Sequence, residues 1–459
     1  MRVAWRRVEE KREGTSLFAH FIGGSQIGIY LDSCEKGRYD VIAWEPVRSR
    51  KLNHGEGDSP FSVLDELVSQ IPTVEDTPVD APPFLFGVLG YFSYEAAWDE
   101  EWIGLPKERL DPVHDVYFMI PGKVIVLDHE AEEMWLVVTT LEEDPDPSLD
   151  SLVAEVLHLS QKKLHPQGGE LVSPLTAEID VTTYRERLGR VQEYIARGDI
   201  YQANLSYQVE GRVAGDSWDL YCVLRKTNPG AYAAYIRMPT YAILSSSPEQ
   251  FIRRQGDMIK TRPIKGTRPR GATEEEDEQY RDELAGSEKD QAELVMIVDL
   301  ERNDFGRVCA MGSVEVTDLF AIDPHPTVWH QSAQVTGRLP EGTSMGEVLR
   351  MAFPGGSITG APKIRSMQVI HELENQRRGI YTGSIGYVDP RGSSEWNIAI
   401  RTMTWVGGEG RLSYRVGGGI VADSDPDLEF AETLAKGQGM VRAIEEWTAT
   451  PAMRRLSQS

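Results

Sequence analysis

The sequence has few cysteines and no long hydrophobic run. Its 459 residues include three cysteines, Cys34, Cys222 and Cys309, which are far apart and show no CxxC spacing. Neither a disulfide framework nor a zinc site is therefore supported. No apolar stretch approaches membrane-spanning length, and the charged N-terminal sequence lacks the apolar core of a signal peptide. We expect a cytoplasmic protein with no membrane partner.

Positive charge is also scarce. The chain has 48 Lys and Arg residues against 72 Asp and Glu residues, which gives a formal net charge of −24. Such a surface repels phosphate backbones, so we expect no nucleic-acid partner. A chain of 459 residues is too long for one ordinary hydrophobic core. It predicts two domains, or one large domain with two layers.

The pattern of apolar residues divides the chain into two segments. Residues 1–160 contain short apolar strands such as "FLFGVLGYFSYE" and "KVIVLDH" and are predicted to form an N-terminal domain. Residues 161–178 are rich in proline, glycine and charge without periodicity, and we interpret them as a linker. Residues 178–450 are predicted to form the second domain.

Three helices are predicted in the second domain. The first runs from a capping box at Thr183 to Gly198, and a strand within "DIYQANLSYQVEGRV" follows it. The second spans 287–304, with Ser287 as its N-cap. The third starts at Asp425 and continues to the C-terminal region.

Two of these helices carry paired acids. Asp290 and Glu293 are three residues apart, as are Glu429 and Glu432, and Lys436 follows four residues after Glu432. This spacing places the side chains of each helix on one face. Two such faces meeting across a cleft would form an oxygen-rich site for Mg²⁺. For an isolated pair, a solvated helix face is the commoner explanation.

Two glycine-rich stretches are candidate anion sites. Gly417, Gly418 and Gly419 follow a strand, and "FPGGSITGAPKIRSM", which contains Thr359 and Gly360, leads into a helix. Glycine lets backbone N–H groups approach an anion closely, and carboxylates would suit both stretches. Neither stretch has the GxxxxGK[ST] or GxGxxG order. A tight turn without a ligand explains the first stretch equally well.

Four single residues are candidates for chemistry. Arg401 lies in the apolar strand "WNIAIRTM", where its planar fork suits a carboxylate ligand or an internal salt bridge. His330 is either a proton donor or a structural histidine, and alone the second is favoured. Glu249 begins a strand and alone would be a surface residue. Lys265, in "TRPIKGTRPRG", is either a surface cation or a reactive amine.

The order of the motifs resembles that of the chorismate-utilising enzymes. The matching stretches cover roughly residues 180–445 and read "SPEQF", "TRPIKGTRPRG", "AELVMIVDLERND", "FPGGSITGAPKIRSM", "GSIGYV", "IAIRT" and "GGGIVADSDPDLEFAETLAK". This family includes the large subunits of anthranilate synthase and aminodeoxychorismate synthase, and the isochorismate and salicylate synthases. The resemblance implies an α/β (α+β) fold, a sandwich of two antiparallel sheets with outer helices, and an active site in the cleft.

The resemblance also implies ligand-binding residues. It implies Mg²⁺ bound through Glu293 and Glu432, with Glu429 and Asp290 as supporting ligands. Chorismate has two carboxylates, and the groups implied to hold it are Arg401, Tyr387, Lys436, the glycines at 417–419 and the turn with Thr359 and Gly360.

Differences within the family favour ammonia as the nucleophile. Water-using members carry a lysine base where this chain has Gln202, and a glutamine cannot deprotonate water. Anthranilate synthases typically read PIAGT where this chain reads "PIKGT", and Asn204 in "YQANLS" fits the same distinction. These positions resemble the large subunits of aminodeoxychorismate synthases, which serve 4-aminobenzoate and folate biosynthesis.

The resemblance implies a mechanism for Lys265. Its amine attacks C2 of chorismate while Glu249 protonates the leaving 4-hydroxyl, and ammonia then enters at C4 and expels the lysine. The amine must be neutral, and we expect apolar neighbours and Arg268 or Arg270 to lower its pKa from about 10.4. Otherwise, Lys265 pairs with a structural acid.

Two other functions stay open, and a partner is implied. The chain could be an anthranilate synthase large subunit, or a non-catalytic chorismate-binding subunit. None of the three cysteines lies in a GxCxG setting, so we expect the chain to lack glutaminase activity of its own. The resemblance implies a heterodimer with a small glutamine amidotransferase subunit that supplies ammonia.

Overall fold

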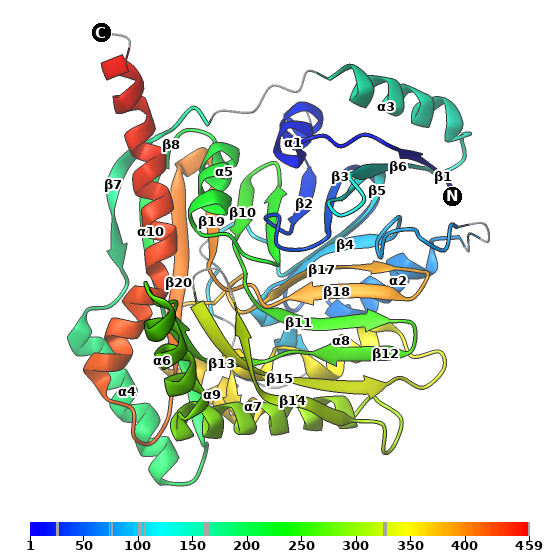
Figure 1. Ribbon diagram of the computed structural model, residues 1–459. Helices are drawn as coiled ribbons and strands as arrows, with labels where there is room; N and C mark the ends of the chain where they lie inside the picture. Colours follow the sequence, from blue (N-terminus) through cyan, green and yellow to red (C-terminus); the bar gives the residue numbers. More distant parts are fainter. Residues whose placement is uncertain are drawn as a thin grey trace.

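The computed structural model describes residues 1–23, 27–72, 74, 77–99, 103–104, 107–109, 111–159, 166–324 and 328–457 (Figure 1). Its strands form one continuous antiparallel network that folds into two layers. Within the described ranges, no helix is long and apolar enough to cross a membrane.

The first layer is an eleven-member row of antiparallel strands. In spatial order they are β1 (Arg2–Val8), β6 (Glu133–Thr140), β5 (Val116–Asp128), β3 (Tyr39–Leu52), β2 (Gly28–Asp32), β9 (Ala233–Arg237), β10 (Tyr241–Ser245), β19 (Thr402–Val406), β20 (Arg411–Ile420), β8 (Gln202–Ala214) and β7 (Glu170–Ala177). The short β16 (Gly360–Ala361) pairs with the start of β8.

The second layer continues from the other half of β5. It runs through β4 (Val88–Phe92), β17 (Ser384–Asp389), β18 (Ser393–Asn397), β11 (Gln250–Gln255), β12 (Met258–Thr261), β15 (Val328–Arg338) and β14 (Glu315–Pro324). After β12 the chain continues as β13 (Ile264–Pro269), which also pairs with β15. The long strands β3 and β5 pair along both halves, with a register shift between Pro46 and Arg48. They therefore belong to both layers.

Helices cover the outer faces of the layers (Figure 1). The first layer packs against α1 (Gly14–Ile22), α3 (Asp146–His158), α4 (Val181–Ala196), α5 (Ser217–Thr227) and α10 (Pro426–Ser457). The second packs against α2 (Pro60–Ser69), α7 (Glu288–Gly306) and α8 (Met345–Ala352). Next to β13 and β8 lie α6 (Glu274–Ala285) and α9 (Lys363–Leu373), and the 3₁₀ turns are η1 (Tyr94–Asp99), η2 (Gly356–Ile358) and η3 (Gly407–Glu409).

Two apolar cores follow from strand alternation. In β10, Ile243 faces one core and its neighbours Ala242 and Leu244 face the other, because successive side chains of a strand point to opposite sides. The hydroxyls of Tyr91 in β4 and Tyr241 in β10 lie 2.6 Å apart and join the two layers. The predicted two-sheet sandwich with outer helices is confirmed.

Several predicted boundaries are confirmed and two are wrong. Ser287 caps α7 by accepting a hydrogen bond from the backbone of Asp290 at 3.3 Å. The first predicted helix, α4, begins at Val181 because Asp180, not Thr183, is its N-cap. Part of the predicted linker lies outside the described residues, but 170–177 form the edge strand β7. Its side chains are mostly exposed, so no apolar alternation marks it in the sequence.

The two predicted domains share both layers. Strand β2 pairs with β9, and β4 pairs with β17, so strands of residues 1–160 lie next to strands of residues 178–450 in each layer. The division of the chain into two folding units stays a prediction.

Candidate functional site

Lys265 lies near acidic residues of both α7 and α10. Its amine, on β13, lies 3.7 Å from a carboxylate oxygen of Glu293 on α7. Burial acts to raise the pKa of Glu432 on α10, but the positive charges of Lys436, Lys265 and Lys289 outweigh it and the pKa is lowered. Lys436 lies 2.8 Å from Glu432. One acid from each predicted face, Glu293 and Glu432, is thus near Lys265.

Glu249 is a buried carboxyl in the same neighbourhood. It precedes β11, and the Ser357 hydroxyl of η2 donates a hydrogen bond of 2.7 Å to its Oε1. Burial raises the pKa of Glu249, although Ser357 and the positive charges of Lys265, Arg401 and Lys436 act in the opposite direction. A raised pKa suits a carboxyl to general acid catalysis.

Arg401 brings an uncommitted positive charge to the site. Among the residues that the structure describes, its guanidinium group forms no hydrogen bond or ion pair. Burial lowers its pKa, and the charge of Glu249 acts against that shift. The internal salt bridge considered from the sequence is therefore absent from the described parts of the chain. A half-buried guanidinium without an acid is suited to binding a carboxylate ligand.

The three glycines at 417–419 lie in a strand, and the predicted turn is wrong. They belong to β20 and pair with β8. A Cβ atom on Gly418 would lie 3.3 Å from Glu429 Oε2 and 3.8 Å from Lys436 Nζ. The Lys436 amine donates to the carbonyl of Gly417 at 3.1 Å. The glycines therefore let the polar face of α10 approach the backbone of β20.

The second glycine-rich stretch borders the same site. It contains η2, whose Ser357 binds Glu249. Thr359 is fully buried, and its hydroxyl donates to the carbonyl of Gly355 at 3.0 Å. Gly360 has a φ of 136°, and a Cβ there would lie 2.1 Å from the carbonyl oxygen of Gln202. No other residue fits that position without moving β8.

The remaining metal-site candidates have partners of their own. Asp290 lies 3.3 Å from Arg268, and Glu429 accepts a hydrogen bond of 2.7 Å from Ser424. Burial raises the pKa of Glu429, and the charge of Glu432 adds to that rise. In the described ranges, no group of three or more His, Cys, Asp or Glu side chains is arranged to hold a metal ion.

The two arginines that follow Lys265 are committed to acids. Arg268 lies 2.7 Å from Glu283, besides its contact with Asp290, and Arg270 lies 2.5 Å from Asp277. They are therefore not free positive charges beside Lys265, in contrast to the prediction from the sequence. The neighbour that Lys265 does have is the carboxylate of Glu293.

His330 and Tyr387 occupy different positions. His330 lies on β15, and its Nδ1 is 2.9 Å from the Thr267 hydroxyl, two residues along β13 from Lys265. Tyr387 is buried on β17 against Phe84, in a cavity of about 870 Å³ that Glu395 also lines. The structure thus places His330 near Lys265, whereas none of the other predicted site residues is among the described residues that line the cavity at Tyr387.

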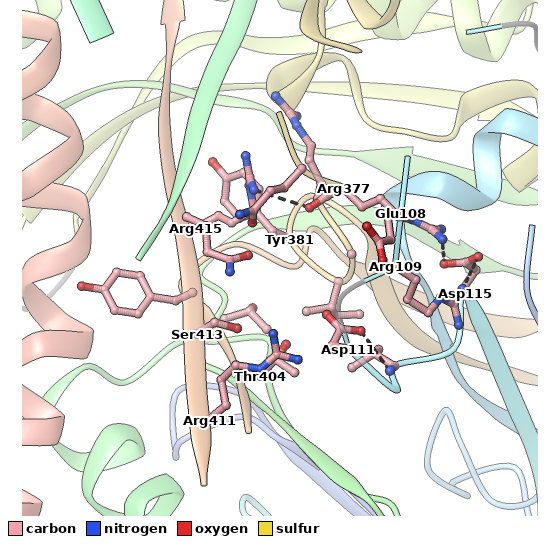
Figure 2. Close-up of a pocket in the computed structure, with 18 residues that line it drawn as sticks. Glu108, Arg109, Asp111, Asp115, Arg377, Tyr381, Thr404, Arg411, Ser413 and Arg415 are labelled. Atoms are coloured by element: carbon pink, nitrogen blue, oxygen red, sulfur yellow. Dashed lines mark hydrogen bonds and ion pairs between the residues drawn. The ribbon is translucent and has the colours of Figure 1, made fainter. Parts of the chain in front are cut away.

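A second polar region lies between the layers, and no predicted site residue lines it (Figure 2). Arg109 and Arg377 each lie 2.6 Å from Asp115, and Arg415 lies 3.2 Å from Glu374. The cavity among these side chains is about 40 Å³, which is room for little more than a water molecule. This region is a charge network between segments of the chain.

Sequence reasoning missed Ser357 and Glu301. Ser357 is a small residue in a glycine-rich turn, and no pattern marks it as the partner of Glu249. Glu301 is buried on α7, eight residues after Glu293, and it interacts electrostatically with Glu249. Glu301 follows Glu293 by eight residues, which is two steps of four. This spacing could have indicated that both side chains lie on the same face of the helix.

Comparison with known proteins identifies the class. The family model described as chorismate binding enzyme matches residues 27–442, and the chain belongs to this family. It is 35% identical over 439 residues to "Aminodeoxychorismate synthase component 1" of Bacillus subtilis (strain 168), covering 91% of each chain. It is 34% identical over 458 residues to "Anthranilate synthase component 1" of Aquifex aeolicus (strain VF5), covering 94% of this chain and 92% of that one. The crystal structure of anthranilate synthase component I from Streptococcus pneumoniae TIGR4 has a TM-score of 0.78 at 29% identity, covering 88% of this chain and 92% of that chain.

Proposed function

We propose that this chain is the chorismate-aminating component of an aminodeoxychorismate synthase, which converts chorismate and ammonia to 4-amino-4-deoxychorismate. The observation that carries the proposal is a lysine, Lys265, in one neighbourhood with the buried acid Glu249 and the uncommitted Arg401. The similarity to the Bacillus subtilis protein supports the same activity.

The proposed reaction uses two displacements. The neutral amine of Lys265 bonds to C2 of chorismate, both ring double bonds shift by one position, and the C4–O bond breaks as Glu249 gives its proton to the leaving hydroxyl, which departs as water. Ammonia then bonds to C4, both ring double bonds shift back, the bond between C2 and Lys265 breaks, and the new ammonium group at C4 returns a proton to Glu249. Without the lysine, ammonia would add at C2, which leads toward anthranilate.

The charges of the site suit a dianionic substrate. Arg401 would bind one carboxylate of chorismate through its planar fork, and Lys436 beside Gly417 would offer a second positive charge. We place His330, near Lys265, as a candidate for later proton transfers.

We include Mg²⁺ in the proposal. Glu293 and Glu432 would hold it, with Glu429 and Asp290 in support, because carboxylate oxygens are the ligands that Mg²⁺ prefers. A cation between α7 and α10 would also relieve the repulsion between Glu429 and Glu432. When bound, it would neutralise a substrate carboxylate. Lys265 and Lys436 would then be released from Glu293 and Glu432.

We also propose a separate glutamine amidotransferase subunit as the ammonia source. The three cysteines are not arranged as a glutaminase nucleophile: burial raises the pKa of the thiols of Cys34 and Cys222 and that of Cys309 to about 11. The purified chain should turn over chorismate with ammonium at raised pH and should show no turnover with glutamine alone.

Anthranilate synthase is the second candidate, because the Aquifex aeolicus relative carries that name. Product analysis separates the two. The purified chain is incubated with chorismate, Mg²⁺ and ammonium, with and without an added aminodeoxychorismate lyase. We expect 4-aminobenzoate only when the lyase is present. Anthranilate formed without the lyase would replace our proposal with the second candidate, and no turnover would support a binding subunit.

A further inference from the structure

Glu301 is a buried acid that the proposed reaction does not use. It lies on α7, and its side chain is almost fully enclosed, with the residue 7% exposed. Glu293, Ile297 and Glu301 follow one another at steps of four, so they lie along one face of the helix. Glu293 reaches Lys265 at one end of this face. Glu301 therefore lies about two helical turns deeper.

The buried end of this helix face lies next to η2, the turn whose Ser357 binds Glu249. A Cβ atom on Gly356 would lie 2.7 Å from the side chain of Leu300, so η2 packs directly on α7 beside Glu301. The next residue of η2, Ser357, donates its hydroxyl to Glu249. Thr261, at the end of β12, acts to lower the pKa of Glu301, so it also faces this acid. Glu301 and Glu249 thus share one enclosed polar cluster.

The charges around Glu301 offer it no counter-ion. The charged groups that face it are Glu249, Asp304 and Lys363, and two of these are acids. Lys363 is already bound to Asp304 at 2.7 Å and to the carbonyl of Ala352 at 2.6 Å. Within the described parts of the chain, Glu301 Oε2 has no hydrogen-bond partner. An ionised carboxylate in this position would be desolvated and repelled.

We propose that Glu301 is a positioning residue that keeps its proton in the working enzyme and acts through Glu249. When Glu249 has given its proton to the leaving group, the neutral acid of Glu301 stabilises the new carboxylate, and the pair never carries two negative charges. Burial and the charges of Glu249 and Asp304 raise the pKa of Glu301 well above its ordinary value, which agrees with this role. The role of Glu249 as general acid rests on the proposed function.

Infrared difference spectroscopy tests the protonation directly and needs no substrate. Wild type, Glu301→Gln and Glu249→Gln are compared in D₂O at neutral pH. We expect the Glu301→Gln variant to lose a carboxylic-acid C=O band that Glu249→Gln retains. Asp299→Asn, on the exposed side of the same helix, is the control and should leave the band unchanged. Loss of a carboxylate band, in place of the acid band, in Glu301→Gln would show that Glu301 is ionised and would overturn the proposal.

Kinetics on chorismate tests the coupling to Glu249. Glu301→Leu should lower kcat roughly 10- to 100-fold with KM unchanged, the scale of one hydrogen bond to a charged group. Glu301→Gln should restore most of the rate, because its amide also donates, and should make kcat less sensitive to high pH than in wild type. Wild-type kcat and pH profile in Glu301→Leu would overturn the positioning role. If wild type does not turn over chorismate, the proposed function fails while the infrared result still decides the protonation of Glu301.

Discussion

Two polar regions of this protein differ in how their charges are matched. In the network of Figure 2, each of Arg109, Arg377 and Arg415 lies beside an acid. Around Lys265, in the described residues, the guanidinium of Arg401 has no acid and Glu301 has an oxygen without a partner. Burying an unmatched charge costs stability. Such groups are expected where a ligand or a reaction uses them, so the mismatch supports the proposed site, whereas the matched network is expected to serve structure.

The strongest test removes the proposed nucleophile. Lys265→Ala should lower formation of 4-amino-4-deoxychorismate by about 10³-fold or more, which is about 4 kcal/mol of transition-state stabilisation. Chorismate should still bind, because Arg401 and Lys436 remain, and equilibrium binding measures this. Lys123→Ala, whose partner Glu45 is at the surface, is the matched control and should be fully active. Wild-type amination by the alanine variant would remove Lys265 from the nucleophile role.

A substitution in the matched network should affect stability first. Glu374 is 2% exposed and binds both Arg378 and Arg415, so Glu374→Gln leaves two buried guanidinium groups without their acid. We expect a loss of about 3–5 kcal/mol in the free energy of unfolding, measured with urea. The kcat per folded molecule should fall far less than in Lys265→Ala. Full stability together with lost activity would place this network in the site and would contradict the structural role that we assign to it.

The pH dependence of stability tests the structural role of the matched network through Glu95, which lies near Arg377. Burial raises the pKa of Glu95 from 4.5 to about 7, against the opposing charge of Arg377. Since the folded pKa is the higher one, folding favours the neutral form, and stability falls as pH rises from about 4.5 to about 7. One pKa unit corresponds to 1.36 kcal/mol, so we expect a loss of roughly 2–3 kcal/mol over this range. Urea unfolding between pH 4.5 and 8 measures it, and a flat profile would contradict it.

The smallest effect is expected at the substrate anchor. Arg401→Lys keeps the charge but loses the planar fork, so KM for chorismate should rise about tenfold with little change in kcat. The unfolding free energy should not fall, because Arg401 has no acid partner to lose in the described residues. A drop in stability with KM unchanged would show that Arg401 is structural.

Local chemistry made part of this structure predictable. The N-cap Ser287 and the start of α10 at Pro426 follow from residue preferences that act within one helical turn. The acidic pairs of α7 and α10 follow from helical spacing. These features depend on neighbours in the sequence, which a pattern records.

Features set by distant contacts were not predictable in this way. β7 is stabilised by its pairing with β8. Because the side chains of β7 are mostly exposed, its own sequence shows no apolar alternation that would predict a strand. The glycines at 417–419 read as a turn, but they give room to Glu429 and Lys436 from another element. The motif around Tyr387 predicts a place in the site but does not reveal that its ring contacts Phe84. Each of these outcomes depends on packing between distant segments.

The shared strands have a consequence for how the protein is made. Leu89 in β4 pairs with Tyr387 in β17, so β4 can complete its pairing only after a strand nearly three hundred residues later in the chain has been synthesised. Contacts of such long sequence separation form slowly and only after loop closure has been overcome. On the ribosome, the first strands would expose their edges until most of the chain has been synthesised. We expect the nascent chain to depend on chaperones, and a fragment ending before β17 to aggregate when expressed alone.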